Sequence, residues 1–226
     1  MLRVATYNTH DCIGRDGRYL PERIAEILLS LDAQVIALQE ITLDAAGELQ
    51  SRFEKTLGMQ ILDGTVFERG IGRYGNVLLS RCRIVEQKLH DLSITGHERR
   101  GLLDAVLDDG GQRFSVFATH LGLARRERKN QIEQLCTRLA ARKGPSLLLG
   151  DFNVWRGDKE LCPITALGFK QFRVRSFPTW RRPLVALDHI FSRSPSVLQR
   201  CWRYDTPLSR IASDHYPVVA EIQVTG

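Results

Sequence analysis

The stretch Leu147-Leu148-Leu149-Gly150-Asp151-Phe152-Asn153 joins a short apolar run to a pair of polar side chains. An apolar run of about four to eight residues predicts a strand that is buried on both faces. In layered α/β proteins the functional loops gather at such strand ends. By itself, however, an Asp-Phe-Asn tripeptide after a strand is more often an Asx turn.

The same arrangement of an apolar run and a polar residue recurs along the chain. A single strand-end Glu is usually a surface residue, and a lone His is usually a partly buried residue with a satisfied partner, so each instance is weak alone. Together they predict one site, since Asp and Glu suit Mg²⁺ or Mn²⁺ and neighbouring histidines suit proton transfer. The other instances are Val4–Tyr7 before Asn8, Val35–Gln39 before Glu40, Phe114–Thr119 before His120, and two late motifs, Leu187-Asp188-His189 and Ser213-Asp214-His215.

Helix and strand patterns alternate around these motifs. Ile24, Ile27, Leu28 and Leu31 have helical spacing and predict a helix over Leu20–Leu31. Because strands follow one another directly between residues 76 and 119, we expect an α/β protein with mixed sheets. Further helices are expected over 45–57 and 125–142, and strands over 4–8, 34–38, 76–80, 103–107, 114–119, 146–149, 188–191 and 218–224.

Length and composition are those of an ordinary globular chain. The 226 residues carry a net charge of +6 and a pI of about 9.3, which favours anionic partners without choosing among them. No internal repeat or linker interrupts the sequence, so residues 1–226 are expected to form a single domain.

Cysteine usage and hydropathy restrict the cellular context. The five cysteines are odd in number and contain no Cys-x-x-Cys pair, which argues against a disulfide framework or a zinc site. We expect reduced thiols in a cytoplasmic protein. The sequence has no signal-peptide pattern and no apolar run of about 18 residues, so no membrane-spanning segment is expected.

The order of the motifs resembles that of the endonuclease/exonuclease/phosphatase superfamily, which includes deoxyribonuclease I, abasic-site endonucleases, neutral sphingomyelinases, inositol polyphosphate 5-phosphatases and deadenylases. The resemblance covers nearly the whole chain and is specific for the superfamily but not for a substrate. It implies a four-layer α/β/β/α sandwich with two mostly antiparallel or mixed β-sheets, and a site where the sheets open. The matching motifs are Arg3–Asn8, Gln39-Glu40, Tyr74-Gly75-Asn76, Thr119-His120-Leu121, Gly150–Asn153, Leu187–Ile190 and Ser213–Val218.

The resemblance also implies roles for individual residues. Glu40 would hold Mg²⁺ or Mn²⁺, with Asn8 as a ligand or positioner and Asp214 binding or screening the metal. In the catalytic set, Asp151 would orient or deprotonate the attacking water, and Asn153 would bind the phosphate and steady that water. His120 and His215 would contact the non-bridging oxygens, and Asp188 would hold His215 in its tautomer. Tyr74 would donate a hydrogen bond to the phosphate. Phosphoester hydrolysis needs such charge neutralisation and an in-line water, and the sequence has no G-x-S-x-G nucleophile motif.

Two basic features bear on the substrate. The segment Leu161–Leu187 lacks Asp and Glu and interleaves Arg with aromatic residues, so Arg175 and Trp180 are candidate substrate-binding residues. The alternative is that its aromatics are core and its arginines solvated. Arg100, in Arg99-Arg100-Gly101, is a candidate phosphate ligand or else a surface arginine.

The function predicted from these residues is that of a divalent-metal-dependent phosphodiesterase or phosphatase. A small or lipid-headgroup phosphoester is favoured, because the compact chain leaves little room for loops that enter nucleic-acid grooves. A DNA endonuclease or abasic-site repair nuclease is the alternative, and a non-catalytic binding module of the same fold is a distant one. An anionic membrane surface stays open as a partner, and the oligomeric state is not predicted.

Overall fold

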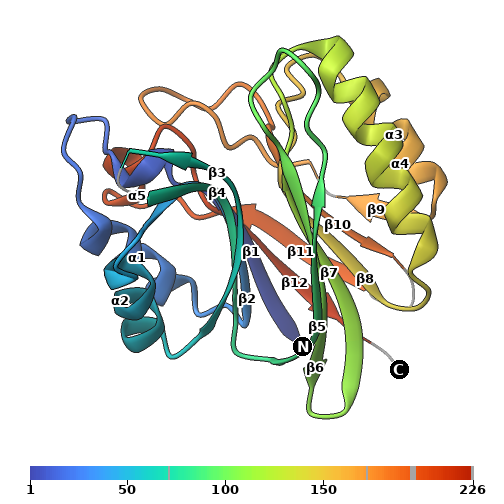
Figure 1. Ribbon diagram of the computed structural model, residues 1–226, viewed down its shortest axis with the longest axis horizontal. Coiled ribbons are helices and arrows are strands. Elements are labelled where there is room, and N and C mark those ends of the chain that lie inside the picture. Colours follow the sequence, from blue (N-terminus) through green and yellow to red (C-terminus); the bar gives the residue numbers. More distant parts are fainter. Residues whose placement is uncertain (71, 172, 194–196, 225–226) are drawn as a thin grey trace.

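Two six-stranded β-sheets pack face to face, and helices cover both outer faces (Figure 1). The computed structural model describes residues 1–70, 72–171, 173–193 and 197–224. The first sheet has the order β11 (Val197–Arg203), β12 (Val218–Gln223), β1 (Leu2–Asn8), β2 (Val35–Asp44), β4 (Gly72–Ser80) and β3 (Gln60–Arg69). The second has the order β5 (Arg83–Asp91), β6 (Gly101–Asp109), β7 (Gln112–His120), β8 (Ser146–Asp151), β10 (Asp188–Arg193) and β9 (Phe169–Gln171).

The helices form the two outer layers. Against the first sheet pack α1 (Pro21–Leu31) and α2 (Glu48–Leu57), and against the second pack α3 (Arg125–Ala141) and α4 (Cys162–Ala166). The short elements η1 (His10–Cys12), η2 (Asp158–Leu161) and α5 (Ser209–Ala212) lie in connecting loops. The expected four-layer α/β/β/α sandwich is therefore confirmed.

Three apolar cores hold these layers together. Side chains alternate across each strand, so Val4 of β1 faces the other sheet while Ala5 and Tyr7 face the helices. The central core between the sheets includes Leu147 and Leu149, whereas Leu148 packs against α3. This double burial explains why the central strands are continuous apolar runs.

Strand direction brings the polar motifs to one end of the sandwich. Within each sheet one central pair is parallel, β1 with β2 and β7 with β8, and the other pairs are antiparallel, so both sheets are mixed as expected. The parallel pairing places His120 opposite Asp151 at the ends of β7 and β8. Because β10 runs antiparallel to β8, its first residue, Asp188, pairs with Asp151, the last residue of β8.

The predicted elements are present, with two differences. The strand expected over 34–38 continues to Asp44, so Glu40 lies inside β2 rather than after it, where the register with β4 shifts between Leu38 and Ile41. Strands β3, β5, β9 and β11 were not predicted. Strand β5 is a largely exposed edge strand, so it lacks the apolar run that marks the central strands.

No helix among the described residues is both long enough and apolar enough to cross a membrane. No disulfide joins any of the five cysteines, all of which lie in the described part of the chain. Cys12 and Cys82 are buried, and Cys162 is exposed.

Candidate active site

A cavity of about 400 Å³ opens where the two sheets end. Its walls come from both sheets and from the loops that follow them. Asn8 and Asp188 lie buried behind this wall. The lining includes eight residues singled out in the sequence: Glu40, Tyr74, Arg100, His120, Asp151, Asn153, Asp214 and His215.

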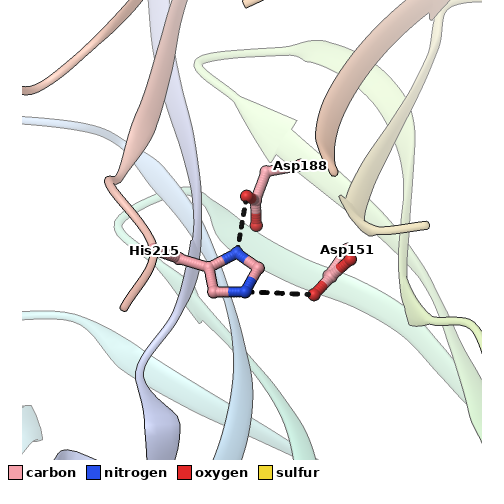
Figure 2. A group of neighbouring side chains, drawn as sticks. All are labelled: Asp151, Asp188 and His215. Atoms are coloured by element: carbon pink, nitrogen blue, oxygen red, sulfur yellow. Dashed lines mark hydrogen bonds and ion pairs between the residues drawn. The ribbon is translucent and has the colours of Figure 1, made fainter. Parts of the chain in front are cut away.

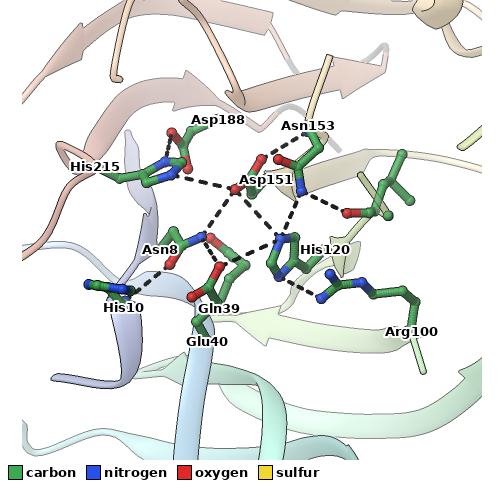
Figure 3. A network of polar contacts seen from close by, with 12 residues as sticks. Asn8, His10, Gln39, Glu40, Arg100, His120, Asp151, Asn153, Asp188 and His215 are labelled. Atoms are coloured by element: carbon green, nitrogen blue, oxygen red, sulfur yellow. Dashed lines mark hydrogen bonds and ion pairs between the residues drawn. The ribbon is translucent and has the colours of Figure 1, made fainter. Parts of the chain in front are cut away.

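Asn8 joins two carboxylates that line the cavity, those of Glu40 and Asp151 (Figure 3). Its Nδ2 donates to Glu40 Oε1 at 2.8 Å and to Asp151 Oδ2 at 3.1 Å. Its Oδ1 accepts from the backbone N–H of His10 at 3.1 Å. The amide oxygen is thus held away from the carboxylates, and Asn8 positions them instead of presenting an oxygen between them.

His215 lies between two buried carboxylates (Figure 2). Its Nδ1 is 2.8 Å from Asp188 Oδ2, and its Nε2 is 3.8 Å from Asp151 Oδ2. Burial alone would lower the pKa of His215, but the charge and hydrogen bond of Asp188, with the charge of Asp151, outweigh it and raise the pKa to about 10. The ring is therefore an imidazolium at neutral pH.

His120 is buried beside a cation and has the opposite charge state. Arg100 Nη1 lies 3.1 Å from Nδ1, and because a guanidinium only donates, Nδ1 must accept. Burial, with the charges of Arg100 and His215, holds the pKa of His120 well below its usual range. The ring is neutral, with Nε2 3.6 Å from Asp151 Oδ2 and 3.9 Å from Glu40 Oε1.

Asp151 is the most enclosed of the cavity carboxylates. Burial raises its pKa to about 6, helped by the charge of Asp188 and opposed by that of His215. Its Oδ1 accepts the backbone N–H of Asn153 at 2.9 Å, and Asn153 Nδ2 donates to the carbonyl of Leu121 at 2.9 Å. A carboxyl with this pKa can exchange a proton near neutral pH.

The backbone is strained on both sides of the cavity. Glu40 and Asn153 both have a φ of 52°, in the left-handed region that costs a non-glycine residue roughly 1–3 kcal/mol. Glu40 is held there because Thr9 Oγ1 donates to its carbonyl at 2.8 Å. The turn His10–Cys12 has three consecutive positive φ angles, of 49°, 53° and 59°. Strain of this kind often accompanies functional sites.

The predicted substrate-binding residues occupy different places. Arg100 lines the cavity, but its Nη1 contacts His120 and Glu98. Trp180 is not among the lining residues, and its ring centroid lies 5.4 Å from that of Phe177, which lines the cavity. The side chain of Arg175 is exposed and does not line the cavity.

Three contributors were missed in the sequence. Ser176 Oγ donates to Asp188 Oδ2 at 2.5 Å, Phe177 packs 4.9 Å from the His215 ring, and Ser213 Oγ donates to the Asn8 carbonyl at 2.8 Å. The basic aromatic segment did contain Ser176 and Phe177, which follow Arg175 by one and two residues and precede Trp180 by four and three.

The cavity offers two arrangements for a divalent cation. Asp151, Asp188 and His215 place one ligand atom each within 4.8 Å of one another. An imidazolium has no lone pair to offer, however, so His215 in its charged form does not ligate. Glu40 and Asp151, held by one Asn8 nitrogen, present the carboxylate oxygens that Mg²⁺ and Mn²⁺ prefer, and this donor set fits such an ion.

The sequence profile of the Endonuclease/Exonuclease/phosphatase family matches residues 5–215. The chain belongs to this family. The uncharacterized protein YbhP of Escherichia coli is 31% identical over 254 aligned positions, which cover 99% of this chain and 96% of YbhP.

Solved structures of the family share the fold. An endonuclease/exonuclease/phosphatase from Beutenbergia cavernae has a TM-score of 0.82 at 23% identity, covering 100% of this chain and 72% of that one. The mannosyl-6-phosphatase Bt3783 of Bacteroides thetaiotaomicron has a TM-score of 0.76 at 20% identity, covering 99% and 100%. D. rerio TDP2, complexed with a single-strand DNA product, has a TM-score of 0.77 at 18% identity, covering 99% of both chains. Family members are generally phosphoester hydrolases that use divalent metals.

Proposed function

We propose that this chain is a metal-dependent phosphoester hydrolase that cleaves a small or lipid-headgroup phosphoester with Mg²⁺ or Mn²⁺. The observation that carries the proposal is the meeting of Glu40 and Asp151 on one Asn8 nitrogen, beside the imidazolium of His215. These residues come from both sheets, and residues 1–226 are proposed to act as one domain.

Glu40 would hold the cation, with Asp151 bound to the same Asn8 nitrogen and Asp214 at the cavity wall. When bound, the cation supplies Lewis-acid neutralisation of the phosphate charge. Asn8 keeps the two carboxylates in place rather than binding through its oxygen.

Asp151 orients the attacking water and accepts its proton. Its raised pKa matches a general base that works near neutral pH. Asn153 lines the cavity, fixed by its backbone bond to Asp151, and takes the role of binding the phosphate and the water.

Positive charge and hydrogen-bond donors stabilise the non-bridging oxygens. His215 donates from Nε2 as a full cation, and Asp188 fixes its ring through Nδ1. His120 acts as a neutral group oriented by Arg100, and Tyr74 adds a hydroxyl at the wall. Arg175 and Trp180 do not line the cavity and take a secondary part in binding.

The size of the cavity favours a small substrate. A volume of about 400 Å³ falls in the range of small-molecule pockets, roughly 300–1,000 Å³. A nuclease is the second candidate, favoured by the single-strand DNA product bound to TDP2, which has the same fold. A binding module without catalysis would not need the buried Asp188–His215 pair.

A substrate panel tests the proposal. It contains bis-aryl phosphate, aryl phosphate, sphingomyelin, phosphoinositides, an abasic oligonucleotide and plasmid DNA, each with Mn²⁺. We expect turnover of a small or lipid phosphoester, and kcat at least about 100-fold lower in Asp151→Ala and His215→Ala. Asp109→Ala, which changes an exposed acid at the end of β6, is the control. Full activity of both site variants contradicts the assignment, and efficient plasmid nicking favours the nuclease.

A further inference from the structure

The segment 177–185 forms a short hairpin beside the cavity. Phe177 lines the cavity and pairs with Val185, and the N–H of Leu184 donates to the Phe177 carbonyl at 2.9 Å. The tip between them exposes two apolar side chains, Trp180 at 49% and Leu184 at 51%. Arg181 and Arg182 are exposed between these two.

Other loops at the cavity mouth also expose apolar side chains. Trp155 and Leu123 line the cavity and are 47% and 69% exposed. Ile211 of α5 is 44% exposed. Arg15 connects it to the hairpin: the backbone N–H of Arg15 donates to the Ile211 carbonyl, and the Arg15 guanidinium lies 6.0 Å from the Trp180 ring centroid. These five side chains form an apolar rim around a polar cavity: Leu123, Trp155, Trp180, Leu184 and Ile211. Exposed apolar groups gathered at one place mark an interaction surface.

The same loops are strongly basic. Asp16, an acidic residue of the loop that carries Arg15, is engaged by Arg23 at 2.8 Å and so offsets little of this charge. Positive charge of this density attracts an anionic surface. The exposed cations on the loops that carry the rim side chains are Arg15, Arg18, Arg156, Arg181 and Arg182. Arg125 and Arg126 are also exposed at the start of α3, where Arg125 lies 3.5 Å from Glu160.

We propose that this rim docks the molecule on an anionic lipid bilayer, with the apolar side chains in the headgroup region and the cavity mouth facing the lipid phosphates. Trp and Arg are suited to such an interface, because each joins an apolar body to a polar tip. The inference rests on the proposed function, because docking on a bilayer would select lipid-headgroup phosphoesters among the substrates proposed for the cavity. It uses the rim and not the catalytic residues.

A bilayer accounts for more of the rim than other occupants do. A nucleic acid would use the arginines and stack on Trp155 or Trp180, yet it offers nothing to Leu123, Leu184 or Ile211. A bilayer buries all five apolar side chains while its headgroups meet the cations around them.

Vesicle binding tests the inference independently of turnover. The Asp151→Asn protein in EDTA is mixed with one of two kinds of vesicle, either pure phosphatidylcholine or an equal mixture of phosphatidylcholine and phosphatidylglycerol. The bound fraction is measured by sedimentation. We expect at least tenfold stronger partition with phosphatidylglycerol, decreasing with salt. Adding Trp180→Ser and Leu184→Ser should weaken partition into the vesicles with phosphatidylglycerol about tenfold or more. Adding Arg181→Gln and Arg182→Gln instead should weaken the same partition about fivefold for each arginine removed.

Val85→Ser with Leu89→Ser is the matched control. Both side chains are similarly exposed, at 38% and 44%, but lie on the edge strand β5, which contributes no residue to the cavity lining. Equal partition into the two kinds of vesicle, or equal loss in the β5 control, overturns the inference. Because no hydrolysis is required, a protein that binds vesicles but cleaves nothing would overturn the proposed function alone.

Discussion

Two buried histidines in one cavity hold opposite charge states because of their neighbours. His215 faces Asp188 and is charged, whereas His120 faces Arg100 and is neutral. The cavity thereby pairs one cationic donor with one uncharged imidazole at the same pH. The pairing of Asp188 with His215 was expected from the family resemblance. The charge states could not be predicted, because burial and the contact of Arg100 with His120 come from the fold.

Asp188→Asn should lower the pKa of His215 from about 10 to its ordinary value or below, because burial would no longer be opposed by the Asp188 charge. Histidine NMR titration of the metal-free protein measures this. A His215 pKa that stays near 10 would show that Asp188 is not the source of the shift.

The same pair should make the stability of the metal-free protein depend on pH. The pKa of His215 is higher in the folded protein, at about 10, than in the unfolded chain, at about 6.5. The stability that this difference contributes is fully present below pH 6.5 and is lost as the pH rises through about 10. The free energy of unfolding should thus fall between pH 6.5 and 9 by up to about 1.4 kcal/mol per pH unit. Urea unfolding at several pH values checks this, and Asp188→Asn should flatten the slope.

At the scale of elements, contact between β7 and β8 depends on a glycine. Gly150 has a φ of 154°, and a Cβ there would lie 2.0 Å from the Thr119 carbonyl oxygen. Gly150→Ala should therefore cost about 1–3 kcal/mol in the free energy of unfolding and displace Asp151. Gly144→Ala is the control, since its φ is also positive, at 85°, but no atom lies near its Cβ. The free energy of unfolding of both variants is measured with denaturant. Equal losses in Gly150→Ala and Gly144→Ala would show that the contact with Thr119 is not the cause.

Helix α2 begins on the side chain of Asp44. Its carboxylate accepts the N–H groups of Glu48 at 3.0 Å and Leu49 at 2.8 Å, and the bond to Leu49 contributes most to the lowered pKa of Asp44. Asp44→Ala should cost about 1 kcal/mol. This stability is present above the unfolded pKa of about 3.9 and is lost as pH falls through the lowered value. The Tm values of the wild type and of Asp44→Ala should therefore converge in acid. A Tm difference that stays constant with pH would show that the Asp44 carboxylate is not the source of the stability.

Elements with a strong local pattern could be predicted, and those defined by neighbours could not. Helix α1 matched its expected range within one residue because apolar spacing sets it. Edge strand β5 was missed because half-exposed strands lack that pattern. The bulge that turns Glu40 into the cavity was invisible too, since it comes from the register with β4. Asn8, His120 and Asp151 could be assigned to the candidate site because each ends an apolar run, whereas Ser176 and Phe177 reach it only through folding of the 177–185 hairpin.

At the scale of the whole molecule, metal binding should couple to folding. A ligand that binds only the folded chain stabilises it by about 2.7 kcal/mol at 100 times its Kd. Mn²⁺ should thus raise the Tm of the wild type, and EDTA should abolish turnover without unfolding the protein. Glu40→Gln should lose the Tm increase, while Glu26→Gln, an exposed acid on α1, should keep it. An unchanged increase in Glu40→Gln would place the ion elsewhere.

The hydrogen bonds of Asn8 reach from one sheet to the other, since Glu40 belongs to β2 and Asp151 to β8. Turnover therefore reports how closely the halves of the sandwich are docked. In mild acid or low denaturant, a swollen state that keeps its strands but loosens the central core should be inert while its far-UV circular dichroism is still native. For the same reason, neither sheet alone can form the site, because Asn8 and Glu40 belong to the first and Asp151 to the second.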